Sequence, residues 1–109
     1  MATVGIDIEN ILRFSKLDYQ NKLSFYEKIF TKSEIKYCLS KPDPYPHFTA
    51  RFCAKEATIK ASSNKKINFK DIEVIIENSK PVLKIRNERL GAVSLSHTDE
   101  YAIAIVLID

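Results

Sequence analysis

The feature that most constrains the fold is a stripe of alanines between residues 47 and 61. The alanines recur at four-three-four spacing, which places them on one face of an α-helix. Prolines interrupt the preceding stretch, so we expect this helix to begin near His47 and run to about Ala61. A face of small side chains lets another backbone approach closely. The alanines are Ala50, Ala54, Ala57 and Ala61, and the prolines are Pro42, Pro44 and Pro46.

Residues 4–9 alternate between apolar and other side chains, which is typical of a half-buried β-strand. Successive side chains of a strand point to opposite faces, so Val4, Ile6 and Ile8 share one face. Asp7 and Glu9 share the other. We expect the apolar face to lie against the core and both carboxylates to project away from it.

The remaining patterns are helical first and then alternating. Residues 11–41 are expected to form helical pieces, one of them started by a capping box of Thr31 and Glu34. A final strand that is apolar on both faces is predicted to be central and covered on both sides. The strands after the long helix are expected within residues 72–77, 81–85, 92–97 and 101–108. The predicted fold class is α+β, an antiparallel sheet packed on one long helix plus short helices, in a single domain of residues 1–109.

Composition excludes several classes of function. The net charge of +3 is too small to indicate nucleic acid binding, although it permits an acidic partner. Gly5 and Gly91 are the only glycines, which excludes a glycine-rich phosphate loop. The two cysteines lack metal-type spacing and favour a reduced intracellular protein. The sequence shows no leader and no membrane-spanning run, so we expect a cytoplasmic protein without membrane contact.

Acidic side chains on the predicted strand and helix are candidate metal ligands. Mg²⁺ prefers oxygen ligands and is commonly held by one or two carboxylates together with substrate phosphates. Asp7 and Glu56 suit that pattern if the strand packs beside the long helix, and Glu9 could add a third carboxylate. The alternative is that all three are solvated surface acids.

Basic side chains beside Glu56 also allow two interpretations. Lys55 and Lys60 could neutralise phosphate charge, or could simply solvate the helix. A surface pair of Glu56 with Lys60, one turn apart, is worth only about 0.3–0.5 kcal/mol. Periodicity alone favours that surface pair.

Further polar residues are ambiguous in the same way. His97 ends a predicted strand and is either a phosphate-binding donor or base, or a polar cap. The basic residues of the early helices form either a solvated surface or a docking patch for an acidic protein. They are Arg13, Lys16, Lys22, Lys28, Lys32 and Lys36.

Four segments in order along the chain resemble holo-[acyl-carrier-protein] synthase, the short bacterial type of 4′-phosphopantetheinyl transferase. The phrase K-E-A-x-x-K-A joined to an N-terminal G-I-D-I and a C-terminal S-H-T is highly specific. The segments are Gly5-Ile6-Asp7-Ile8 with Ile11 and Arg13; Ile29-Phe30-Thr31 with Glu34 and Tyr37-Cys38; Arg51-Phe52 through Lys55-Glu56-Ala57 to Lys60-Ala61; and Ser94-Leu95-Ser96-His97-Thr98 with Tyr101-Ala102-Ile103-Ala104.

The resemblance implies one long helix on an antiparallel sheet, assembled as a homotrimer with active sites between subunits. It implies transfer of 4′-phosphopantetheine from coenzyme A to a serine of apo-acyl carrier protein, with release of adenosine 3′,5′-bisphosphate. Glu56 or a metal-bound water would take the serine proton. By position, the resemblance implies Mg²⁺ ligands at Asp7 and Glu56, a phosphate contact at Lys60, a nucleotide contact at His97 and Thr98, and a carrier-protein contact at Arg13.

The chain departs from the short family at two places. Glu9 makes a D-x-E pattern seen in the larger surfactin-synthetase-type transferases, where the second acid helps to bind metal. A glycine-containing turn is usual after the long helix, and residues 62–66 replace it here. Lys65 or Lys66 is therefore expected to contact the 3′-phosphate of the coenzyme.

Two other classes of protein fit the composition. One is a non-catalytic, basic α+β module that binds RNA or an acidic protein, although no aromatic-rich RNA-binding signature is present. The other is a structural assembly protein, favoured by the alanine stripe and the doubly apolar last strand. The aligned acids would repel the phosphates of RNA unless a cation intervened.

Overall fold

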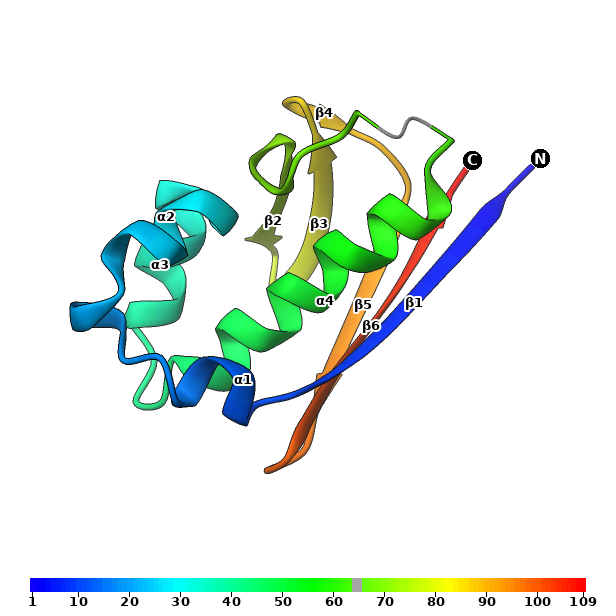
Figure 1. Cartoon of the computed structure of the whole chain (residues 1–109). Helices are drawn as coiled ribbons and strands as arrows, with labels where there is room; N and C mark the ends of the chain where they lie inside the picture. The colour runs from blue at the N-terminus through cyan, green and yellow to red at the C-terminus, as the bar shows by residue number, and fades with distance from the viewer. Residues whose placement is uncertain (64–65) are drawn as a thin grey trace.

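The long helix α4 (Tyr45–Ala61) lies across one face of a three-stranded antiparallel sheet in the computed structural model, which describes residues 1–63 and 66–109 (Figure 1). That sheet has the strand order β1-β6-β5, and a second antiparallel sheet has the order β2-β3-β4. The other elements are β1 (Thr3–Asn10), α1 (Leu12–Ser15), η1 (Tyr19–Asn21), α2 (Leu23–Ile29), α3 (Lys32–Leu39), η2 (Phe69–Asp71), β2 (Ile72–Glu77), β3 (Lys80–Ile85), β4 (Glu88–Arg89), β5 (Ala92–His97) and β6 (Tyr101–Ile108).

The predicted α+β class is confirmed, and α4 begins two residues earlier than expected. Pro44 is the N-cap residue and Pro46 lies in the first turn of the helix. Proline is tolerated there because the first backbone N–H groups of a helix have no intrahelical partner. The capping box at the start of α3 is also present. The Thr31 hydroxyl accepts a hydrogen bond from the Glu34 N–H, and the Glu34 carboxylate accepts one from the Thr31 N–H.

The alanine stripe is the surface on which β1 rests. Its four alanines are all buried, between 0% and 6% exposed. A Cβ atom added at Gly5 would stand 1.8 Å from the backbone oxygen of Ala57, so only glycine permits this approach. The prediction that the stripe admits a second backbone is therefore confirmed.

The orientation predicted for β1 is wrong. Val4, Ile6 and Ile8 are more than half exposed, whereas Gly5 is buried and Asp7 and Glu9 are partly buried. Strict alternation defines two faces of a strand but does not say which one meets the core. Here α4 approaches β1 so closely that the contact needs a residue without a side chain, which is Gly5. The face of β1 that carries Gly5 therefore meets the helix, and Asp7 and Glu9 lie on that same face.

Strand β6 is central, as predicted, but this chain covers only one of its faces. Ala102, Ala104 and Val106 are buried under α4. Tyr101, Ile105 and Leu107 alternate with them and stay exposed. They continue the apolar side of β1, because the register pairs Val4 with Leu107 and Ile6 with Ile105. We call this surface the outer sheet face. It comprises Val4, Ile6, Ile8, Tyr101, Ile105 and Leu107, which are 42% to 60% exposed.

A cluster of aromatic rings joins the short helices to the N-terminal half of α4. Phe14, Tyr26 and Phe48 are fully buried in it, and the Tyr26 hydroxyl donates to the backbone oxygens of Phe14 and Leu17. The rings of Tyr26 and Phe48 lie 4.7 Å apart between centroids. This cluster fixes α1 against the part of the sheet where β1 ends.

Candidate active site

Asp7 and Lys60 meet at the C-terminal half of α4. The Lys60 ammonium donates to Asp7 Oδ1 at 3.0 Å and to the backbone oxygen of Ile6 at 3.0 Å. The hydrogen bond to Asp7 raises the pKa of Lys60, so this amine remains protonated. In the described part of the chain Glu56 forms no ion pair with Lys60, so the surface pair that periodicity favoured is wrong.

The second carboxylate oxygen of Asp7 lacks a partner. Asp7 Oδ2 is buried and has no hydrogen bond within the described residues, while the whole side chain is 15% exposed. A buried carboxylate oxygen without a partner is costly, and a bound cation removes that cost. Oδ1 already accepts from Lys60, so Oδ2 is the atom that suits a metal ion.

The other predicted acids, Glu9 and Glu56, act on the buried thiol of Cys53 through their charges, as Asp7 does. Burial, and then the charges of Asp7, Glu9 and Glu56, raise the pKa of Cys53 to about 12. Three carboxylates acting on one thiol show that the region is negative and suits a divalent cation. Sequence reasoning gave Cys53 no place in the site, because an isolated cysteine within a helical pattern resembles any other core residue.

Glu9 is engaged in another interaction. Its carboxylate accepts from the Arg13 guanidinium at 2.9 Å, and that guanidinium also lies over the Phe52 ring, 4.7 Å from its centroid. Among residues 1–63 and 66–109, no group of three or more His, Cys, Asp or Glu side chains is gathered as a metal-binding cluster. The assignment of Asp7 and Glu56 as a metal-binding pair therefore stays a prediction.

Lys55 does not face the site, contrary to the prediction that it could neutralise phosphate charge. Its side chain is fully buried and pairs with buried Glu34 at 2.8 Å. The Lys55 ammonium also donates to the backbone oxygens of Phe69 and Ile72. Burial lowers the pKa of Lys55, and the Glu34 charge opposes that shift. The capping box identified Glu34, but no sequence signal indicated its burial.

His97 and Thr98 lie in a separate place, at the turn between β5 and β6. The Thr98 hydroxyl accepts from the backbone N–H of Tyr101, and the His97 ring lies 5.8 Å from that of His47. Burial, and then the charge of Arg51, lower the pKa of His47. The structure shows no contact between these two residues and Asp7 in the described ranges. Lys65 lies outside the described residues.

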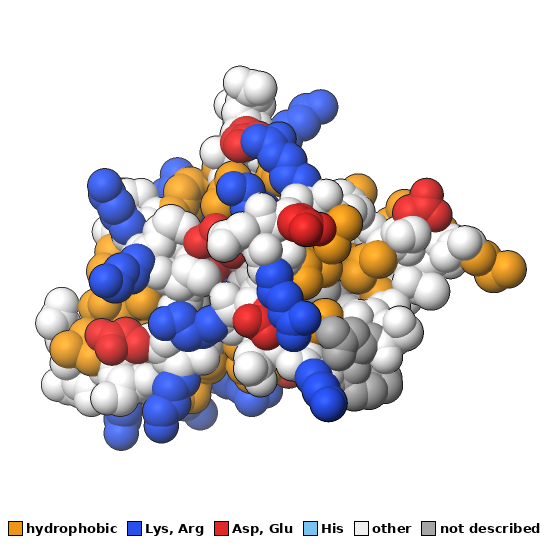
Figure 2. Space-filling model, turned by 90° about the horizontal axis from the view of Figure 1, so that it is seen from above, with side chains coloured by type: hydrophobic (Ala, Val, Ile, Leu, Met, Phe, Trp, Pro, Cys, Tyr) orange, Lys and Arg blue, Asp and Glu red, His pale blue; other side chains and the backbone are white. Residues whose placement is uncertain are grey.

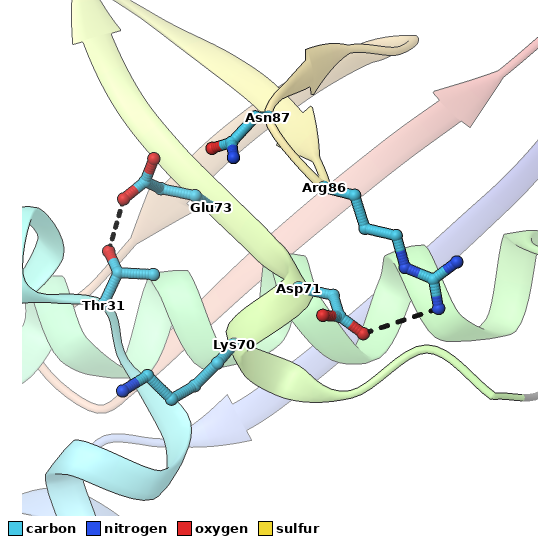
Figure 3. Close-up of a pocket in the computed structure, with 6 residues that line it drawn as sticks. All are labelled: Thr31, Lys70, Asp71, Glu73, Arg86 and Asn87. Atoms are coloured by element: carbon cyan, nitrogen blue, oxygen red, sulfur yellow. Dashed lines mark hydrogen bonds and ion pairs between the residues drawn. The ribbon is translucent and has the colours of Figure 1, made fainter.

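A cavity of about 310 Å³ lies between the start of α3 and the β3–β4 turn, away from these acids. Figure 3 shows that its polar groups largely satisfy one another. The Thr31 hydroxyl donates to Glu73 at 2.5 Å, and Arg86 pairs with Asp71 at 3.7 Å. None of the predicted site residues that the structure describes lines this cavity, so size alone does not locate the candidate site.

In the part of the chain that the structure describes, no helix has the length and hydropathy needed to cross a membrane.

Residues 3–106 match a family model described as the 4′-phosphopantetheinyl transferase superfamily. A holo-[acyl-carrier-protein] synthase of Carboxydothermus hydrogenoformans is 41% identical, with 99% of this chain and 98% of that protein covered. One from Chlamydia caviae is 39% identical, with 97% and 95% covered.

Two solved structures show the same fold. The holo-(acyl-carrier-protein) synthase of Bacillus anthracis in complex with CoA (3′,5′-ADP) superposes with a TM-score of 0.83 at 32% identity, covering 97% of this chain and 94% of that one. The Helicobacter pylori enzyme in complex with coenzyme A superposes with a TM-score of 0.82 at 28% identity, covering 97% and 99%.

Proposed function

This chain belongs to the 4′-phosphopantetheinyl transferase superfamily, as an enzyme of the holo-[acyl-carrier-protein] synthase type, and we propose that it transfers 4′-phosphopantetheine from coenzyme A to a serine of apo-acyl carrier protein. The observation that carries the proposal is the unpartnered, buried Oδ2 of Asp7 beside the Lys60 ammonium. This arrangement suits a diphosphate bound together with a divalent metal, because the carboxylate oxygen can bind the metal and the ammonium can bind the diphosphate.

Asp7 and Glu56 would hold a magnesium ion, which when bound supplies positive charge against the diphosphate of the coenzyme. The unpartnered oxygen of Asp7 supports this assignment, as does the half-buried position of Glu56 one turn after Cys53. Glu9 stays a candidate third ligand, although its present partner is Arg13.

Lys60 would bind an oxygen of the transferred phosphoryl group and offset its charge. Its side chain is 53% exposed, so the ammonium can reach a ligand while it keeps its bond to Asp7. The carrier serine oxygen would attack the β-phosphorus, and the bond to the leaving oxygen would break to release adenosine 3′,5′-bisphosphate. Glu56 is the candidate base for the serine proton.

We propose that the chain works as a homotrimer in which a second copy completes each site. One chain does not join His97 and Thr98, the proposed nucleotide contacts, to Asp7 within the described ranges, and Lys65 is proposed as a third contact. The outer sheet face supports association, because a contiguous apolar surface of this kind marks an interface. Light scattering distinguishes this assembly from a single chain of 12.5 kDa, and a monomer at working concentration would refute it.

The proposed reaction is tested by incubating the full chain with coenzyme A, magnesium and apo-acyl carrier protein. Mass spectrometry should show the carrier gaining the mass of one phosphopantetheine. A carrier whose acceptor serine is replaced by alanine should gain nothing, and chelation of the metal should stop the reaction. A carrier left unmodified under the complete conditions would exclude the proposed activity.

Arg13 is proposed to meet the acidic carrier protein. Its guanidinium is half exposed and is held in place by Glu9 and the Phe52 ring. Arg13→Glu should weaken carrier binding by about thirtyfold, because it removes one attraction and adds one repulsion, each worth about 1 kcal/mol. Coenzyme A binding should change much less.

Calorimetric titration with each ligand checks this prediction. Lys80→Glu makes the same charge change at the start of β3, away from the site, and should leave both affinities unchanged. Equal losses for carrier and coenzyme in Arg13→Glu would contradict a docking role.

A further inference from the structure

A second cavity, separate from the candidate active site, opens between α2, α3 and η2. Its volume is about 310 Å³, at the lower end of the roughly 300–1,000 Å³ typical of small-molecule sites. None of its lining residues belongs to the proposed transfer machinery. A space of this size suits a small ligand better than an element of another protein.

The cavity has an apolar floor. Phe30 and Ile35 form it and are 1% and 9% exposed, and Tyr19 lines one side. These residues belong to, or pack against, the aromatic cluster that fixes the short helices. The floor is therefore rigid and offers no polar partner to a ligand, which favours a hydrocarbon chain.

The rim of the cavity is mostly cationic. Lys32 and Lys36 stand one turn apart on α3, and Lys70 faces them from η2. Within residues 1–63 and 66–109 none of these three ammonium groups forms a hydrogen bond or an ion pair. Glu27 is the only acid among the described residues that line the cavity, so three positive charges face one negative charge.

The figures agree with this arrangement. Figure 3 shows the Lys70 side chain directed away from Asp71. At the end of the molecule formed by the short helices, on the left of Figure 2, Lys and Arg side chains surround small areas of hydrophobic surface. Charge and hydrophobic surface therefore occur together at this end.

We propose that this cavity binds a linear monocarboxylate, with the carboxylate held between Lys32 and Lys36 and the hydrocarbon chain against Phe30 and Ile35. A small inorganic anion would leave the floor uncovered, and a neutral lipid would leave the lysines unpaired. An amphiphilic anion satisfies both, because charge-assisted hydrogen bonds form at the rim while apolar surface is buried beneath them.

The experiment titrates the full chain with octanoate, acetate and 1-octanol, followed by amide chemical shifts in NMR. Octanoate should bind at least about tenfold more tightly than either of the others, because only octanoate has both the charge and the chain. The shifts should be centred on Phe30 and Ile35. Equal binding of octanoate and 1-octanol, or of octanoate and acetate, would overturn the proposal.

Substitution provides the second test. The double variant Lys32→Gln, Lys36→Gln should lose about tenfold in octanoate affinity and keep its weak affinity for 1-octanol. Both lysines are exposed and unpaired, so thermal unfolding should not change. Lys80→Gln is the matched control and should bind octanoate normally. Unchanged octanoate affinity in the double variant would refute the site, as would binding of an acidic amphipathic peptide with no response to octanoate.

Discussion

Asp7→Ala and Glu56→Ala are each expected to lower kcat/KM for phosphopantetheine transfer by at least about a thousandfold. Each substitution removes one of the two carboxylates proposed to hold the metal, whose charge stabilisation is worth several kcal/mol. The fold should persist, because Asp7 contributes an unpartnered buried oxygen and its ionic partner Lys60 is about half exposed. Transfer is measured by mass spectrometry over a range of coenzyme A concentrations.

Two controls separate loss of the site from loss of the fold. Glu88→Ala removes an exposed carboxylate from β4 and should transfer normally. Circular dichroism and thermal unfolding should be nearly the same for all three variants and for the unchanged chain. Near-normal turnover in both Asp7→Ala and Glu56→Ala with magnesium present would disprove the assignment of these acids.

Lys55→Met is expected to lower the free energy of unfolding by about 3–5 kcal/mol, because it leaves the buried charge of Glu34 without its partner. The same substitution frees two backbone oxygens, those of Phe69 and Ile72. Small proteins have only about 5–15 kcal/mol of stability, so a loss of this size is large. Urea unfolding followed by circular dichroism measures it.

Glu34→Gln in the Lys55→Met background tests the cause. Glu34 accepts from the N–H groups of Thr31 and Val74 on separate oxygens; the neutral amide keeps one of these acceptors and removes the unpaired charge. The double variant should therefore be more stable than Lys55→Met alone. Lys60→Met, which removes an exposed lysine one turn and a half along α4, should change stability by less than about 1 kcal/mol. A Lys55→Met protein as stable as Lys60→Met would show that the buried pair contributes nothing.

Local rules were sufficient for α3, for α4 and for four of the five described strands that follow α4. The four-three-four alanines specify one helix face, and the capping box of Thr31 and Glu34 is satisfied within a single turn. Both features depend on residues that are close in sequence, so the spacing of those residues is enough to predict them. The two-residue strand β4 carries no such pattern and was not predicted.

Local sequence patterns could not predict the partners of the two lysines on α4. Lys55 and Lys60 flank Glu56 with the same residue type, yet one is fully buried against Glu34 and the other contacts Asp7 at the surface. Their partners lie 21 and 53 residues away in the sequence. Periodicity within α4 therefore had no means of separating an internal ion pair from a site residue.

The sequence by itself determined that this chain has a long helix with a small-residue stripe, with strands before and after that helix along the chain. It also determined the order of the acids and lysines. Each of these features depends on short-range spacing. Only the tertiary structure decided which face of β1 meets that helix, and hence that Asp7 comes to Lys60 while Val4, Ile6 and Ile8 remain exposed. The physical reason is the contact of Gly5 with Ala57, a close approach of two distant backbones that no local pattern contains.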